Sequence, residues 1–130
     1  MRIQLVSDLH LEFRPDEDVL ERLTHPDAAE VTLVVAGDLA PAATNGKEAE
    51  AFLRAAAARY RHVVYVLGNH EYYDAEEWGF VQSWAHALRL RVFGAGARNL
   101  HVLMNSEARL GAKLGKRRVP AAPEANTAAA

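Results

Sequence analysis

Residues 63–71 read Val-Val-Tyr-Val-Leu-Gly-Asn-His-Glu, and this stretch decides the fold. Its first five residues form a short apolar run rich in β-branched side chains, which predicts a buried strand. Gly68 ends that strand, because glycine adopts backbone angles that other residues resist. Asn69 and His70 then lie on the loop at the carboxyl end of the strand, where ligands bind in open α/β sheets. An amide oxygen beside an imidazole suits a hard metal ion and proton transfer.

Two earlier stretches repeat this arrangement of an apolar strand followed by a polar loop. Ser-Asp-Leu-His at residues 7–10 follows an apolar run at 3–6, and Gly-Asp-Leu at 37–39 follows an apolar run at 31–36. The three runs are spaced by about thirty residues, the length of a βαβ unit. Parallel neighbouring strands bring their loops to one edge of a sheet. The sequence therefore predicts an α/β fold with a mainly parallel sheet and flanking helices.

Asp8 and His10 are two residues apart, so in an extended backbone their side chains point the same way. This spacing allows Asp-x-His to give two ligands to one metal. Taken alone, the pair favours an Asp turn followed by a surface histidine, and Gly68 to Glu71 alone is equally a polar turn between a strand and a helix. The repetition of the pattern at three strand ends favours a metal site.

Together, Asp8-x-His10, Gly37-Asp38 and Gly68-Asn69-His70-Glu71 resemble the motifs of the calcineurin-like metallophosphoesterase family in order, spacing and strand context. The resemblance covers roughly residues 1–100. It implies a hydrolase that cleaves a phosphomonoester or a phosphodiester by attack of a hydroxide held between two metal ions. The substrate would be a phosphate ester whose identity the sequence does not reveal.

The resemblance also implies a role for each site residue. Asp8, His10 and Asp38 would hold one metal, and Asp38 and Asn69 a second, with Asp38 bridging the two. His70 would not be a ligand but the catalytic group that contacts the phosphoryl oxygen or protonates the leaving alkoxide. Glu71 is expected to orient a neighbouring histidine rather than to bind metal. Mixed oxygen and nitrogen ligands suit two divalent ions of manganese, iron or zinc.

Composition limits the other classes of protein. The 130 residues suit one ordinary domain, half of them are apolar, and the net charge of −2 indicates no broad basic surface for nucleic acid. Without cysteine there are no disulfides or thiolate zinc sites. The residues after Met1 do not form a signal peptide, and no apolar run reaches membrane-spanning length. We therefore expect a cytoplasmic protein without a membrane partner.

The remaining elements are predicted from periodicity and from helix-forming residues. We expect helices over 16–23, 47–61 and 75–88, a loop over 91–98, a fourth strand over 100–104 and a weak fifth over 108–110. The first strand, with its run of Ile, Leu and Val, is expected to be buried on both faces. Asp74 is expected to cap the last helix, whose apolar face would comprise Trp78, Val81, Trp84, Ala85 and Leu88. Tyr72 and Tyr73 follow the site directly, and whether they line it stays open.

The last twenty residues differ from the rest of the chain. Residues 1–110 are predicted to form the metallophosphoesterase-like domain, and residues 111–130, basic and then rich in Ala and Pro, a disordered tail. The resemblance implies a further histidine and a Gly-His-x-His motif downstream, and neither is present. We therefore expect an amino-terminal part of such an enzyme, with its second sheet missing or incomplete, impaired activity and self-association through the incomplete sheet. The alternative is a non-catalytic remnant or a binding module that retains a partial metal site.

Overall fold

A four-stranded, all-parallel sheet forms the centre of the molecule, and its strand order follows the chain, β1-β2-β3-β4. The structure is a computed structural model and describes residues 1–104 and 106–110. The strands are β1 (Arg2–Val6), β2 (Val31–Ala36), β3 (His62–Val66) and β4 (Leu100–Leu103). The predicted α/β class with a parallel sheet is thus confirmed.

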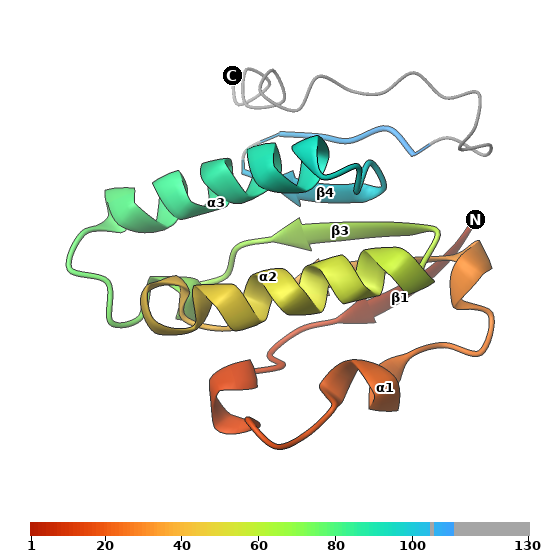
Figure 1. Ribbon diagram of the computed structural model, residues 1–130, viewed down its shortest axis with the longest axis horizontal. Helices are drawn as coiled ribbons and strands as arrows, with labels where there is room; N and C mark the ends of the chain where they lie inside the picture. Colours follow the sequence, from red (N-terminus) through yellow and green to blue (C-terminus); the bar gives the residue numbers. More distant parts are fainter. Residues whose placement is uncertain (105, 111–130) are drawn as a thin grey trace.

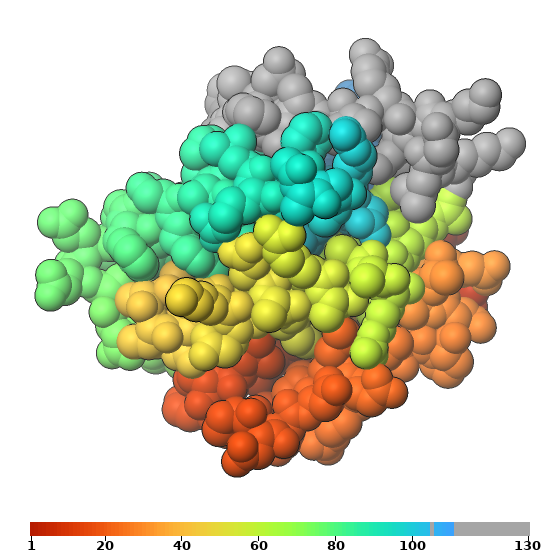
Figure 2. All heavy atoms as spheres, viewed as in Figure 1, coloured from red at the N-terminus to blue at the C-terminus, as the bar shows by residue number. Residues whose placement is uncertain are grey.

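Helices connect successive strands and cover one face of the sheet (Figure 1). The first connection holds the short helix α1 (Val19–Leu23), between the 3-10 turns η1 (Leu11–Phe13) and η2 (Ala28–Glu30). The second is α2 (Ala42–Arg59), and the third contains η3 (His70–Tyr72) and α3 (Trp78–Gly94). Crossovers between parallel strands are right-handed, so a sequential strand order places all the connecting helices on the same face. Figure 2 shows α2 and α3 lying side by side there.

The hydrophobic core lies between this face of the sheet and the two long helices. The strand register aligns Leu33 with Val63 and Leu100, and Val35 with Tyr65 and Val102. These side chains are buried, and they belong to one core cluster with Phe52, Leu53, Ala56, Ala85, Leu88 and Val92 of the helices. Burying a large apolar side chain contributes about 1.5–3 kcal/mol, so this layer supplies most of the stability of the fold.

The opposite face of the sheet carries exposed apolar side chains at its β1 edge. Ile3 is 61% and Leu5 is 68% exposed, so the prediction that the first strand is buried on both faces is wrong. The reason is topological: β1 is an edge strand, and the connecting helices lie on the other face. His62 and His101 also belong to this face by register, but they are buried, with ring centroids 5.6 Å apart.

A charged cluster joins the two long helices. Glu50 of α2 accepts hydrogen bonds from Arg91 of α3, at 2.7 and 3.1 Å, and from Arg54 one turn along its own helix, at 2.9 Å. The Arg91 guanidinium, followed by that of Arg54, holds the pKa of the Glu50 carboxyl below its usual value. This cluster ties the two helices together at their solvent-facing edges.

The helix boundaries differ from the predicted ones for local reasons. The first helix begins later, at Val19, because the Asp18 side chain accepts a hydrogen bond from the Glu21 amide and caps it. The second begins earlier, at Ala42 rather than residue 47, and contains a single non-helical residue, Asn45, in its first turn. The third runs through the first half of the expected 91–98 loop, to Gly94.

Four other expectations about the carboxyl-terminal half are wrong or fall outside the described residues. Trp78 is 75% exposed rather than part of the apolar face of α3, because it is the first residue of that helix and projects beyond the sheet. Asp74 is not the cap, since Glu77 precedes the helix. Residues 108–110 form no strand. The predicted tail, residues 111–130, lies outside the described residues.

None of the helices in the described part of the chain has the length and apolar character needed to cross a membrane.

Candidate metal and catalytic centre

The predicted ligands lie on loops whose backbone is turned into an unusual conformation. Asp8, His10 and Asp38 have positive φ values of 57°, 48° and 58°. The expectation that Asp8 and His10 point the same way from an extended backbone is therefore wrong; left-handed turns bring them together instead. Residues other than glycine held in this region cost of order 1 kcal/mol or more, and such residues cluster at functional sites.

Backbone hydrogen bonds hold the first two loops side by side beyond the ends of their strands. The amide of Asp8 donates to the Gly37 carbonyl at 3.2 Å, and the amide of His10 to the Asp38 carbonyl at 3.2 Å. The Leu11 amide continues this pairing to Leu39 at 2.9 Å. The β1 and β2 loops therefore form one unit, which fixes the positions of the side chains they carry.

The third loop approaches the second too closely for any side chain between them. A Cβ atom on Gly37 would lie 2.8 Å from the Gly68 Cα, and one on Gly68 would lie 2.7 Å from the Asp38 amide nitrogen. Gly37 also has a φ of 79°, which glycine adopts without strain. The two glycines thus allow the loops after β2 and β3 to come into direct contact.

Glu71 joins these two loops from beneath the site. Its carboxylate is fully buried: Oε1 accepts from the amides of Gly68 at 2.8 Å and Asp38 at 2.9 Å, and Oε2 from the Leu39 amide at 2.9 Å and the Tyr65 hydroxyl at 2.7 Å. Glu71 was expected to orient a histidine. These four hydrogen bonds go to backbone amides and a tyrosine instead, and they set the path of the loop that carries Asp38. Burial, and then the charge of Glu71, raise the pKa of Tyr65 well above its usual value.

Asp8, His10 and Asp38 come together at the edge of the sheet. Each offers one ligand atom, and these atoms all lie within 4.8 Å of one another. Asp38 is fixed by the His70 amide, which donates to its Oδ1 at 2.8 Å. The Ser7 hydroxyl donates to Asp8 Oδ2 at 2.6 Å, and this hydrogen bond, followed by the one shared with Asp38, lowers the pKa of the Asp8 carboxyl. Two carboxylates and an imidazole this close together suit a divalent cation, which would offset their charge. Asn69 is exposed and directly precedes η3, one residue before His70.

His70 is buried more deeply than Asp8, His10 and Asp38, and its partner was not among the predicted site residues. The His70 Nε2 contacts Glu12 Oε2, and the side chains are only 10% and 12% exposed. His10 packs against the His70 ring edge-on, with centroids 4.4 Å apart. His10, Glu12 and His70 form a second group with ligand atoms within 4.8 Å of one another. Glu12 follows His10 by two residues, the same spacing that separates Asp8 from His10. This repeated spacing is the sequence signal that could have identified Glu12 as a site residue.

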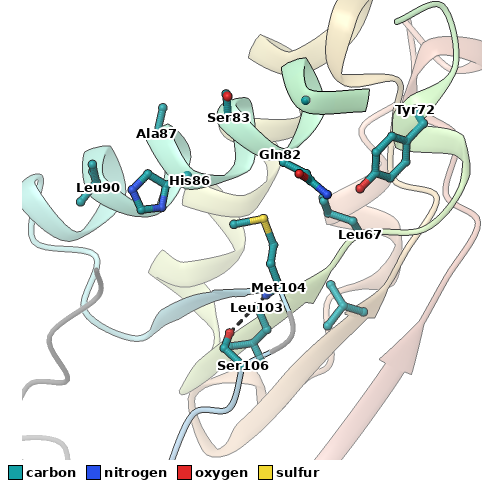
Figure 3. Close-up of a pocket in the computed structure, with 12 residues that line it drawn as sticks. Leu67, Tyr72, Gln82, Ser83, His86, Ala87, Leu90, Leu103, Met104 and Ser106 are labelled. Atoms are coloured by element: carbon teal, nitrogen blue, oxygen red, sulfur yellow. Dashed lines mark hydrogen bonds between the residues drawn. The ribbon is translucent and has the colours of Figure 1, made fainter. Parts of the chain in front are cut away.

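Tyr72 and Tyr73 diverge. The Tyr73 ring lies 4.3 Å from the His70 ring, so Tyr73 lines the site. Tyr72 faces away, contacts Trp78 at 5.5 Å and lines a separate groove of about 970 Å³ between α3 and the ends of β3 and β4 (Figure 3). Gln82, Ser83 and His86 of α3 face this groove. The predicted metal ligands and His70 do not line it.

One of the comparisons with known proteins identifies a family for the chain. No curated protein and no solved structure matches the chain. The family model described as calcineurin-like phosphoesterase matches residues 1–107, most of the 130 residues. The match spans the four strands and all the loops described above. The chain therefore belongs to the calcineurin-like phosphoesterase family of metal-dependent phosphoesterases.

Proposed function

We propose that this chain hydrolyses a phosphomonoester or phosphodiester with the help of two divalent cations held by Asp8, His10, Asp38 and Asn69. The observation that carries the proposal is the gathering of Asp8, His10 and Asp38, by left-handed turns, within 4.8 Å. When bound, divalent cations supply Lewis acidity, which makes water acidic enough to act as a nucleophile at neutral pH and offsets charge on phosphoryl oxygens. Manganese, iron and zinc all fit these donors.

The charge of the donor set favours an anionic substrate. Asp8 and Asp38 carry one negative charge each, whereas His10 and Asn69 are neutral as ligands. Two divalent cations would therefore leave the site positive even with one hydroxide present. An aspartate in place of Asn69 would cancel that remaining charge, so the amide keeps the site attractive to a phosphate ester.

His70 is the proposed catalytic group, and Glu12 is the residue that positions it. The contact between them occupies the His70 Nε2, which leaves Nδ1 to serve the ester. Because both side chains are nearly buried, the imidazole cannot turn freely. His70 would then hydrogen-bond a phosphoryl oxygen or give a proton to the leaving alkoxide.

Metal content tests this proposal. Asp38→Asn keeps an oxygen that accepts the His70 amide, so the loop should stay in place while the bridging charge is lost. We expect the wild-type chain to bind about two manganese ions and, in keeping with the impaired activity expected from the sequence, to hydrolyse bis(para-nitrophenyl) phosphate slowly. Asp38→Asn should remove metal more completely than His10→Ala, and Asp16→Asn, an exposed change between the site and α1, should remove none.

Two results would contradict the proposal. Equal residual metal in Asp38→Asn and His10→Ala would exclude a bridging role for Asp38. A wild-type chain that binds no transition metal would indicate a non-catalytic remnant of the family.

A further inference from the structure

We propose that Phe13 and Tyr73 form an aromatic clamp for the leaving group, and that the preferred substrates are phosphate esters whose alcohol portion carries a flat aromatic ring, such as a nucleobase. The inference rests on the proposed function, because it takes His70 to contact the phosphate ester. It adds a substrate class that the metal ligands alone do not define.

The same local turn places an aromatic residue beside each histidine of the site. The Phe13 amide donates to the His10 carbonyl at 3.0 Å, and the Tyr73 amide donates to the His70 carbonyl at 3.0 Å. Each aromatic residue is thus three positions after a histidine and closes a 3-10 turn, η1 in one case and η3 in the other. The two turns come from different loops, so their convergence is a property of the fold rather than of one segment.

The rings form a continuous group at the site. Phe13 lies 6.0 Å from the His10 ring and 6.1 Å from the His70 ring, and Tyr73 lies 4.3 Å from His70. The imidazoles themselves are 4.4 Å apart. A phosphate ester that reaches His70 must therefore place its alcohol portion near at least one of these aromatic rings.

Both aromatic side chains are exposed, so they contribute little to the packing of the described fold. Phe13 is 72% and Tyr73 is 51% exposed, whereas His70 between them is 8% exposed. An exposed aromatic face beside a buried polar group is the arrangement that binds a ring by stacking while a polar group contacts its substituent. The net charge of −2 favours a single ester over a polynucleotide.

Two probes that differ only by a base test the clamp. AMP and ribose 5-phosphate share the sugar and the phosphate, and calorimetry can compare their affinities for the manganese-loaded and the metal-free chain. Stacking on one ring contributes roughly tenfold or more in affinity. We therefore expect AMP to bind at least roughly tenfold tighter than ribose 5-phosphate.

Leucine variants remove the ring but keep an apolar side chain. Phe13→Leu and Tyr73→Leu should each weaken AMP roughly tenfold and leave ribose 5-phosphate unchanged, which also shows that the variants remain folded. Trp78→Leu is the matched control: Trp78 is 75% exposed but contacts Tyr72 rather than His70. It should change neither affinity.

The outcomes separate this inference from the proposed function. Equal wild-type affinities for the two probes, no binding of either, or equal weakening of both in the leucine variants would overturn the clamp. Hydrolysis of aryl and alkyl phosphates at equal rates by a metal-loaded wild type would also overturn it, while leaving the proposed function intact. A selective loss of AMP binding in a chain that hydrolyses nothing would support the clamp and reject catalysis.

Discussion

Glu71→Gln should destabilise the protein far more than its small change in shape suggests. The carboxylate accepts four hydrogen bonds inside the protein, from three backbone amides and the Tyr65 hydroxyl. A glutamine amide group must replace one of the two oxygens. At the Oε1 position it would face the amides of Gly68 and Asp38, which are both donors. At Oε2 it could donate to the Tyr65 oxygen but would still face the Leu39 amide.

The magnitude follows from these contacts. At best one buried amide loses its acceptor, which costs about 1–3 kcal/mol, and hydrogen bonds to the remaining oxygen lose the strength that a charged acceptor gives. The neutral amide is cheaper to bury than a carboxylate, which offsets part of this loss. We expect a net loss of about 2–4 kcal/mol in the free energy of unfolding, a large fraction of the roughly 5–15 kcal/mol of a typical domain.

Urea unfolding followed by circular dichroism measures this loss. Glu48→Gln is the matched control, because Glu48 is exposed on α2, and it should change stability by less than about 0.5 kcal/mol. If Glu71→Gln unfolds with a free energy within about 0.5 kcal/mol of that control, then Glu71 does not hold the loops together as described.

Three further perturbations test other parts of the structure. His70→Ala should lower turnover by roughly a hundred- to ten-thousandfold with bound manganese unchanged, and loss of the metal would instead make His70 a ligand. Glu50→Gln should cost about 0.5–1 kcal/mol at pH 7 in thermal unfolding. Because Arg91 lowers the pKa of Glu50 in the folded state, the difference in stability between the wild type and Glu50→Gln should shrink as the pH falls through that lowered pKa. A difference that grows in acid would refute the role of the Glu50–Arg91 pair. Leu5→Lys should reduce the concentration-dependent association that we expect of the wild type in sedimentation, since Leu5 is 68% exposed on β1; a wild type that is monomeric at every concentration would refute that expectation.

The parallel sheet could be predicted because its signals are local. Each strand is a short apolar run, and each ends at a glycine or a polar residue that faces a loop, as at Gly37 and Gly68. Parallel pairing then requires those loops to meet, whatever the details of the helices between them. The meeting of Asp8, His10 and Asp38 at one edge follows from the same reasoning.

The contacts within the site could not be predicted, because they join residues far apart in the chain. The partner of His70 is Glu12, 58 residues earlier, and periodicity carries no information on such a pair. The four hydrogen bonds of Glu71 depend on how closely the glycine-containing loops approach. The exposure of Ile3 likewise depends on which strand lies at the edge, which the apolar content of a strand does not determine.

The order of the strands also bears on how the protein is made. Because β1, β2, β3 and β4 follow one another both in space and along the chain, each strand can join a free edge as synthesis proceeds, and no earlier pair has to separate. The loops that carry Asp8 and Asp38 can pair as soon as β2 has emerged, while Glu71, which fixes them, is still to come. The nascent chain can therefore bring Asp8, His10 and Asp38 together before Glu71, the residue that fixes their loops, has been made.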